Sequence, residues 1–316
     1  MKLFISGGSG FIGTRLIEQL LSPLKEIVNF DKVNSPTYSE FTVIGDIRDY
    51  KYLEDTTKEM DCIIHLAAEH MDNINPKSLY YDVNSNGTKN IVKAAENNKI
   101  NQIIFISTVA VYGLNPKSTD ESSELNPFND YGNSKLMGEQ ILIRWAEANS
   151  DRKLVIIRPT VVFGEGNRGN IFRLMERIYS QTFYMIGNGK NRKSIAYIGN
   201  LVMFIIETLD FDKGVHIFNY ADKPDYQMNE FIRVIYHNMQ LSPPIIRLPY
   251  FSGYLLAIFL DFISSLTNKN FSISKVRVQK FCADSIISTV KLDSINFNPA
   301  YKLSEALRIT IKNEFN

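Results

Sequence analysis

The sequence predicts an α/β protein in which a parallel sheet is covered by helices on both faces. Through roughly the first half of the 316 residues, short apolar runs alternate with longer segments of helical spacing. The runs are continuously apolar, as in strands buried on both faces of a parallel sheet. A glycine-rich turn follows the first run and opens the first helical segment. Together these features favour a doubly wound sheet followed by a smaller lobe.

The expected elements alternate in order along the chain. Helices are expected at 11–21, 84–97 and 131–148, where apolar residues recur at helical spacing. Beyond about Gly164 the pattern loosens into shorter elements. We therefore expect a first domain at 1–165 and a smaller α/β lobe at 166–316, some of whose segments return to the first sheet. The strands are expected at 3–5, 27–30, 42–44, 62–66, 103–106 and 154–157.

Composition excludes several classes of protein. Lys and Arg number 35 against 34 Asp and Glu, so no overall field favours nucleic acid. The two cysteines, Cys62 and Cys282, lie far apart in apolar surroundings, which indicates a reducing compartment. The first residues lack a signal-peptide pattern, and no metal-ligand spacing appears. We expect a cytoplasmic protein without a metal site.

The glycine-rich turn predicts a dinucleotide site. Gly7 allows a tight turn, Gly10 lets the backbone approach a pyrophosphate, and Gly13 lets the helix pack closely on the strand. Asp31 ends the next strand at about the spacing expected for a carboxylate on the ribose hydroxyls. Because Asp31 would repel a 2′-phosphate, NAD is favoured over NADP, although Lys32 lies beside it.

One further carboxylate and a Tyr–Lys pair extend this prediction. Asp46 follows the third strand, where it either accepts the adenine amino group or caps the next helix. Tyr131 and Lys135 are four residues apart, on one face of an expected helix. A phenol titrates near ~10, so a base near neutrality needs its pKa lowered by roughly 3 units. Lys135 and a positive nicotinamide ring could together lower the Tyr131 pKa in this way.

In combination, these motifs resemble the extended short-chain dehydrogenase/reductase superfamily. His65–Ala68, Asn84–Thr88, Val111–Gly113 and Arg158–Gly164 also match its motifs, in the right order. The resemblance implies that Thr108 hydrogen-bonds the reacting sugar oxygen, Tyr131 is the acid/base, and Lys135 both binds ribose and lowers the Tyr131 pKa. It also implies NAD contacts at further positions, and a homodimer is common in the superfamily. Those further positions are Phe11, Ile12, Ile47, Leu66, Ala67, Ala68, Asn84, Tyr131 and Pro159.

The residues after Thr108 narrow the reaction. Nucleotide-sugar 4,6-dehydratases of this superfamily carry Asp-Glu there, whereas this chain has Val109 and Ala110. A decarboxylating relative keeps a carboxylate at the position of Ala110. Neither Val nor Ala transfers a proton, so elimination is disfavoured. Hydride transfer without loss of water remains, as in an epimerase or a reductase.

Several longer stretches, among them 193–200 and 219–225, resemble bacterial undecaprenyl-diphosphate N-acetylglucosamine 4-epimerases. The resemblance implies interconversion of lipid-linked GlcNAc and GalNAc for surface glycan assembly. The alternatives are a UDP-GlcNAc or UDP-Glc 4-epimerase, an NAD(P)H-dependent 4-ketosugar reductase and a non-catalytic NAD sensor. For the substrate we consider Glu69, His70, Arg168, Asn170, Arg192 and Lys193, each of which could instead be structural; Asn170 in particular could cap a helix.

The segment 248–266 is strongly apolar, with a single charge at Asp261. Its length is near that of a membrane span, but Pro249, Gly253 and three serines disfavour one. A buried helix of the second lobe is one interpretation. A helix lying at the membrane surface is the other, and a lipid-linked substrate favours it.

Overall fold

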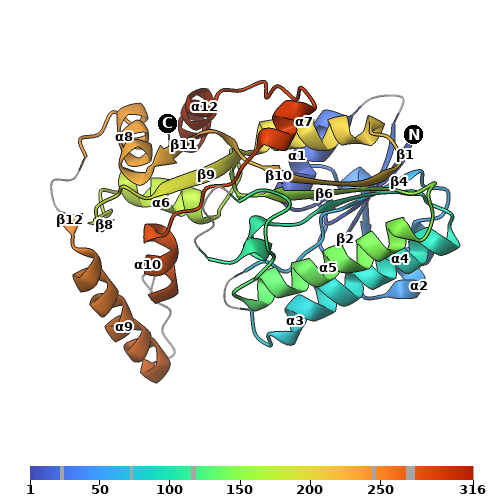
Figure 1. Cartoon of the computed structure of the whole chain (residues 1–316), viewed down its shortest axis with the longest axis horizontal. Coiled ribbons are helices and arrows are strands. Elements are labelled where there is room, and N and C mark those ends of the chain that lie inside the picture. Colours follow the sequence, from blue (N-terminus) through green and yellow to red (C-terminus); the bar gives the residue numbers. More distant parts are fainter. Residues whose placement is uncertain (22–24, 72–73, 115–118, 244–246, 268–274, 316) are drawn as a thin grey trace.

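The protein has two parts, a large parallel sheet flanked by helices and a smaller lobe beside it, as the computed structural model shows (Figure 1). The structure describes residues 1–21, 25–71, 74–114, 119–243, 247–267 and 275–315. In the large sheet the seven strands lie in the order β10-β6-β5-β4-β1-β2-β3. Every neighbouring pair is parallel. The predicted doubly wound sheet is confirmed.

The first six strands coincide with the predicted apolar runs. The seventh, β10, comes from the second half of the chain and pairs with β6. This return of the chain agrees with the expectation that later segments rejoin the sheet, although the boundary at 165 stays a prediction. The strands are β1 (Lys2–Ser6), β2 (Glu26–Asp31), β3 (Thr42–Ile44), β4 (Cys62–His65), β5 (Gln102–Ile106), β6 (Lys153–Pro159) and β10 (Gly214–Tyr220).

Helices cover both faces of the sheet, and each face has its own apolar core. On one face lie α1 (Phe11–Leu20) and α7 (Ile198–Glu207), which touch each other. On the other lie α2 (Tyr50–Thr56), α4 (Thr88–Asn97) and α5 (Asp130–Glu147), with α3 (Ser78–Tyr81) at the end of this layer (Figure 1). Helix–strand alternation in a parallel sheet requires this arrangement, because each crossover must leave the plane of the strands.

The second lobe contains two small sheets and six helices among the described residues. One sheet has the order β11-β9-β7, and the other pairs β12 with β8. The strands are β7 (Val161–Phe163), β8 (Met185–Ile186), β9 (Arg192–Tyr197), β11 (Asp222–Gln227) and β12 (Arg247–Leu248). The helices are α6 (Asn170–Tyr179), α8 (Met228–Asn238), α9 (Tyr250–Thr267), α10 (Lys275–Cys282), α11 (Val290–Ser294) and α12 (Leu303–Phe315).

Helix α9 is the element that departs most from a compact lobe. It projects away from the rest of the lobe, with α10 beside it (Figure 1). Six large apolar side chains on it are exposed: Tyr250, Phe251, Leu255, Leu256, Ile258 and Phe259. The interpretation of 248–266 as a buried helix is therefore wrong, because none of the residues that the structure describes covers these six side chains. No helix in the described part of the chain is long and apolar enough to cross a membrane.

Candidate active site

The candidate site lies along the carboxyl ends of β2, β1, β4 and β5, which are neighbours in the sheet. In an open parallel sheet, ligands bind at this edge because the strand ends and the following helix N-termini meet there. Asp31, Gly7, Leu66 and Thr108 each lie at or just after the end of one of these strands. The fold thus places the predicted cofactor residues and the predicted catalytic hydroxyl along the same edge of the sheet.

The glycine turn after β1 has the geometry that a dinucleotide requires. Gly7 has a φ of +77°, and a Cβ there would lie 2.6 Å from the backbone nitrogen of Ala67. A Cβ on Gly13 would lie 2.3 Å from the Cα of Gly8, so helix and turn touch directly. Gly10 is exposed and precedes α1, and no side chain caps that helix. Its first N–H groups are therefore available to a phosphate, and these residues fit NAD.

Asp31 is held at the rim of this turn. Its carboxylate accepts hydrogen bonds from the backbone N–H of Ser9 (3.0 Å) and of Val33 (3.1 Å). Ser9 Oγ in turn donates to the Val33 carbonyl at 2.9 Å. The carboxylate thus has a structural role in the turn as well as the predicted position for binding ribose.

Asp46 pairs with a nearby arginine and does not cap the N-terminus of α2. Asp49 caps α2, because its side chain accepts the N–H of Tyr52. Asp46 instead pairs with Arg48 at 2.6 Å, and the hydrogen bond from Arg48 lowers the Asp46 pKa. The interpretation of Asp46 as an N-cap is wrong, whereas its adenine role stays a prediction. Ile47 beside it is buried in the core.

Thr108, Tyr131 and Lys135 are brought together by β5 and α5. Thr108 begins the single turn Val109–Tyr112 and accepts the N–H of Ala110 at 3.2 Å. Burial raises the Tyr131 pKa to about 12, and the Thr108 side chain acts in the opposite direction and lowers it by less. In the chain alone, Tyr131 is therefore protonated near neutrality.

Lys135 is almost completely buried, with 1% of its surface exposed. Burial lowers its pKa to about 7, and the negative charge of Glu139 opposes that shift. Its Nζ lies 3.9 Å from the centre of the Phe105 ring, which offers a cation–π contact. Because this pKa is close to neutral pH, a charged ligand bound nearby would change the protonation state of Lys135 strongly.

The loop after β4 is fixed to the catalytic helix through Asn84. Its side chain accepts the N–H of Glu69 at 2.8 Å and donates to the Glu69 carbonyl at 3.0 Å and to Ser134 Oγ at 2.9 Å. Asn84 lies in the π-helical turn Asp82–Gly87 that precedes α4. Such turns often occur at functional sites. The predicted NAD contacts at Leu66, Ala67 and Ala68 are thus held in place relative to α5.

A buried hydrogen-bond network beside the turn Val109–Tyr112 was not predicted from the sequence. Arg158 donates to both carboxylate oxygens of Glu139, at 3.0 and 2.7 Å, and to Tyr112 Oη at 2.6 Å. Tyr112 then donates to Asn219 Oδ1 at 2.8 Å. Glu139 lies one helical turn after Lys135 in α5. This spacing of four residues was the feature of the sequence that could have placed Glu139 near the catalytic residues. Pro159, another predicted NAD contact, directly follows Arg158 at the end of β6.

Ser107 is a second feature that sequence reasoning did not assign to a ligand. It is buried at the end of β5, and its backbone N–H donates to the Ile157 carbonyl at 2.7 Å. Its hydroxyl has no hydrogen-bond partner among the described residues. Buried polar groups are normally satisfied, so this hydroxyl is a group that a ligand could satisfy.

The predicted substrate residues are dispersed. Arg168 pairs with Glu314 of α12 at 2.6 Å and stacks over Phe172. Gly169, not Asn170, occupies the cap position of α6, so the capping interpretation of Asn170 is wrong. Asn170 and His70 are both exposed. None of these contacts joins Arg168 or Asn170 to the catalytic residues.

Arg192 and Lys193 lie together at the start of β9, near the segment after α10. Arg192 donates to the Asp225 carbonyl at 3.2 Å and is exposed. Lys193 donates to the Lys280 carbonyl at 2.7 Å, and burial lowers its pKa to about 8. Two cations at one strand end could hold a diphosphate, and their role stays a prediction.

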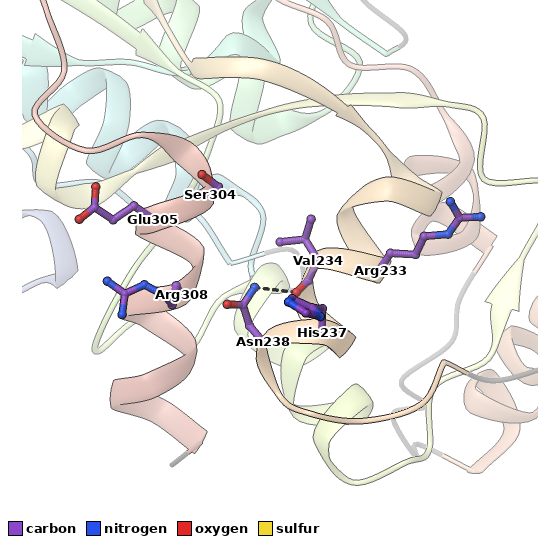
Figure 2. Close-up of a pocket in the computed structure, with 7 residues that line it drawn as sticks. All are labelled: Arg233, Val234, His237, Asn238, Ser304, Glu305 and Arg308. Atoms are coloured by element: carbon purple, nitrogen blue, oxygen red, sulfur yellow. Dashed lines mark hydrogen bonds between the residues drawn. The ribbon is translucent and has the colours of Figure 1, made fainter.

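A hollow of about 670 Å³ opens elsewhere, between α8 and α12 (Figure 2). Arg233 and His237 of α8 and Arg308 of α12 line it. None of its lining residues is among those the sequence singled out, and most of them are exposed, with Val234 and Asn238 half-buried. It is therefore separate from the candidate active site.

Comparison with known proteins places the chain in a family. A model of the NAD dependent epimerase/dehydratase family matches residues 3–221. The chain belongs to this family. The predicted membership and the predicted NAD dependence are thus confirmed, and the match includes the glycine turn, Thr108, Tyr131 and Lys135.

Several of the chain's relatives are 4-epimerases. The chain is 44% identical over 316 residues to an N-acetyl-α-D-glucosaminyl-diphospho-ditrans,octacis-undecaprenol 4-epimerase of Escherichia coli O157:H7, covering 99% of this chain and 95% of the relative. It is 31% identical to a UDP-glucose 4-epimerase of Vibrio cholerae, with 78% of each covered. The Thermus thermophilus UDP-glucose 4-epimerase, solved in complex with NAD, superposes with a TM-score of 0.79 at 19% identity, covering 99% of this chain and 98% of that one.

Proposed function

We propose that the protein is an NAD-dependent 4-epimerase that interconverts N-acetylglucosamine and N-acetylgalactosamine carried on undecaprenyl diphosphate. The observation that carries this proposal is the identity of 44%, over nearly the whole of both chains, to a relative with that lipid-linked substrate. The placement of Thr108, Tyr131 and Lys135 at adjoining element ends supports the chemistry. The product of such a reaction would enter surface glycan assembly.

The residues of the chain divide the reaction between them. Tyr131, as phenolate, would take the proton of the sugar 4-hydroxyl, while Thr108 hydrogen-bonds the same oxygen. Held by the glycine turn and Asp31, NAD would supply a reversible hydride acceptor for C4 of the sugar. Tyr131 then gives the proton back to the oxygen. Nothing is consumed, so the cofactor can stay bound from one turnover to the next.

The local charges explain why this base needs a partner. Burial alone keeps the Tyr131 phenol protonated, with a pKa of about 12. Phenolate becomes favourable when positive charge lies beside it, and Lys135 and the nicotinamide ring are the two sources at this site. The base would thus form only in the loaded enzyme. The residues after Thr108, Val109 and Ala110, have no titratable group, so a dehydration step lacks its acid and base.

The carrier of the sugar is the first point to test. Purified enzyme is given UDP-GlcNAc in one reaction and lipid-diphosphate GlcNAc in another, and the GalNAc product is measured. We expect the lipid-linked sugar to be converted with a kcat/KM at least about 100-fold higher, since differential binding of the carrier would be worth roughly 3 kcal/mol. Conversion of the UDP sugar alone would overturn the lipid assignment.

Two other enzymes remain as candidates. A UDP-sugar 4-epimerase is favoured by the relative from Vibrio cholerae, and the carrier experiment separates it from our proposal. A 4-ketosugar reductase uses the same three residues but consumes one NADH per product. Turnover of many sugars per enzyme without added cofactor supports an epimerase, whereas stoichiometric NADH consumption supports a reductase.

We further propose that α9 rests on the membrane that holds the lipid-linked substrate. Its exposed apolar residues are Tyr250, Phe251, Leu255, Leu256, Ile258 and Phe259. Lys275, at the start of neighbouring α10, places its ammonium 5.9 Å from the Tyr254 ring centre. An apolar helix face with cations near it is typical of attachment to an anionic bilayer surface. This attachment would bring the site to a substrate whose lipid tail stays in the bilayer.

Replacing Phe251 and Phe259 together by serine should weaken vesicle binding by at least about tenfold. Each buried phenylalanine contributes roughly 1.5–3 kcal/mol on transfer from water, so the loss of both is large. Co-sedimentation with phosphatidylethanolamine–phosphatidylglycerol vesicles measures the effect. The matched control replaces Val215 and Val290, which are also exposed and apolar, by serine. Equal binding by the α9 variant and the control would contradict the attachment.

A further inference from the structure

Lys32 and Glu69 form an ion pair that crosses the cofactor site. Lys32 directly follows β2, and Glu69 lies shortly after β4. In the sheet, β1 lies between these two strands, so the pair joins elements about 10 Å apart. The strand that it crosses is the one that ends in the glycine turn. The pair therefore bridges the same strand ends along which the ADP half of NAD would lie.

Both ends of the pair are held by the backbone around them. On the Lys32 side, Asp31 accepts from Ser9 N–H and Val33 N–H, which ties the flanking residues to the glycine turn. On the Glu69 side, Asn84 binds both the N–H and the carbonyl of Glu69. An ordinary surface ion pair is weak partly because two mobile side chains must be ordered. Here the anchored backbones reduce that entropic cost.

The surroundings also separate this pair from a loose surface contact. The Glu69 side chain is 13% exposed, whereas that of Lys32 is 63% exposed. Asp46 and Arg48 lie in the same region. Their mutual hydrogen bond has the largest effect, lowering the Asp46 pKa and raising the Arg48 pKa, and the charges of Lys32 and Glu69 add smaller effects in the same directions. Two positive and two negative side chains thus lie together here. The Lys32 ammonium pairs with the Glu69 carboxylate rather than remaining unpaired for a phosphate.

We propose that Lys32 and Glu69 form a clasp that closes over the ADP half of bound NAD and slows its release. This gives Glu69, which the sequence suggested as a substrate contact, a role in retaining the cofactor. A slow release suits an enzyme in which the same NAD serves every turnover. The proposal rests on the dinucleotide site and makes no use of the sugar or its carrier.

The test measures NAD release from the loaded enzyme in the absence of sugar. Released NAD is captured by an alcohol dehydrogenase with excess ethanol, and the NADH formed is followed by its absorbance. We expect Glu69→Gln and Lys32→Gln each to increase the rate of NAD release about fivefold. This factor corresponds to the upper end of the interaction energies of exposed ion pairs. The double variant should be no faster than either single variant. Exchanging the charges, as Lys32→Glu with Glu69→Lys, should restore slow release to within about twofold.

Other outcomes overturn the clasp. If Lys32→Gln speeds release but Glu69→Gln does not, Lys32 acts on the phosphates by itself. If both single variants release NAD more slowly, the pair obstructs the cofactor. If neither changes release, the pair is only a surface contact. Lys58→Gln, which breaks the exposed pair with Asp55, is the matched control for loss of charge. A failed sugar assay would refute the proposed substrate and leave these release rates unaffected.

Discussion

Tyr131→Phe is expected to abolish epimerisation and leave NAD bound. In the proposed reaction the phenol moves the proton of the 4-hydroxyl, and the Thr108 side chain acts on the same phenol. Removing one oxygen takes away the acid/base without opening a cavity. Loss of a general acid/base lowers turnover by about 10²- to 10⁴-fold. The cofactor contacts at the glycine turn and Asp31 are unchanged, so NAD should co-purify at the normal ratio.

The measurement pairs GalNAc formation with the NAD content of the purified variant. Tyr81→Phe is the matched control, because Tyr81 lies in α3 close to the site but donates its hydroxyl to Asp130 at 3.0 Å. That variant should keep turnover to within about threefold. Unimpaired epimerisation by Tyr131→Phe would contradict the assignment of the base. Loss of NAD together with activity would instead show that Tyr131 holds the cofactor.

Arg158→Met is expected to cost about 3–5 kcal/mol of the free energy of unfolding. It leaves the Glu139 carboxylate, which has no exposed surface, without its bidentate partner. An unpaired buried charge is strongly destabilising, whereas replacing both partners by apolar residues is often nearly neutral. Urea unfolding should therefore show a large loss for the single variant and recovery in Glu139→Met/Arg158→Met.

The matched control for that prediction is Lys213→Met. Lys213 pairs with Asp151, and both side chains are more than 60% exposed. Exposed pairs contribute between about 0 and 1 kcal/mol, so this variant should unfold at almost the wild-type urea concentration. A loss for Arg158→Met no larger than that for Lys213→Met would contradict the importance of the buried network.

Prediction from the sequence was most successful where a pattern is local. The six apolar runs became strands with nearly the predicted ends, because continuous apolar residues can be satisfied only inside the sheet. The glycine turn could be predicted because Gly7 and Gly13 leave no room for a side chain. The interpretations of Asp46 and Asn170 as helix caps were wrong. The cap position of α2 is Asp49, three residues after Asp46, and that of α6 is Gly169, one residue before Asn170.

The buried network and the Lys32–Glu69 ion pair could not be predicted, because their members are distant in sequence. Arg158 and Glu139 belong to β6 and α5, and Lys32 and Glu69 follow β2 and β4. Pairing across such distances depends on strand order, and strand order is a property of the whole sheet. Likewise, the apolar segment 248–266 is compatible with burial or exposure until its neighbours are placed.

Local sequence patterns were enough to predict the fold class and the dinucleotide turn, and they also led to the proposed chemistry at Thr108, Tyr131 and Lys135. These depend on spacing within a few residues, and the apolar neighbours Val109 and Ala110 already disfavoured dehydration. The three-dimensional arrangement was needed to show which charges pair: Glu139 with Arg158, Glu69 with Lys32 and Arg168 with Glu314. It was also needed to show that apolar side chains of α9 are exposed among the described residues. The physical reason is that burial and pairing energies depend on neighbours in space, which a linear pattern does not specify.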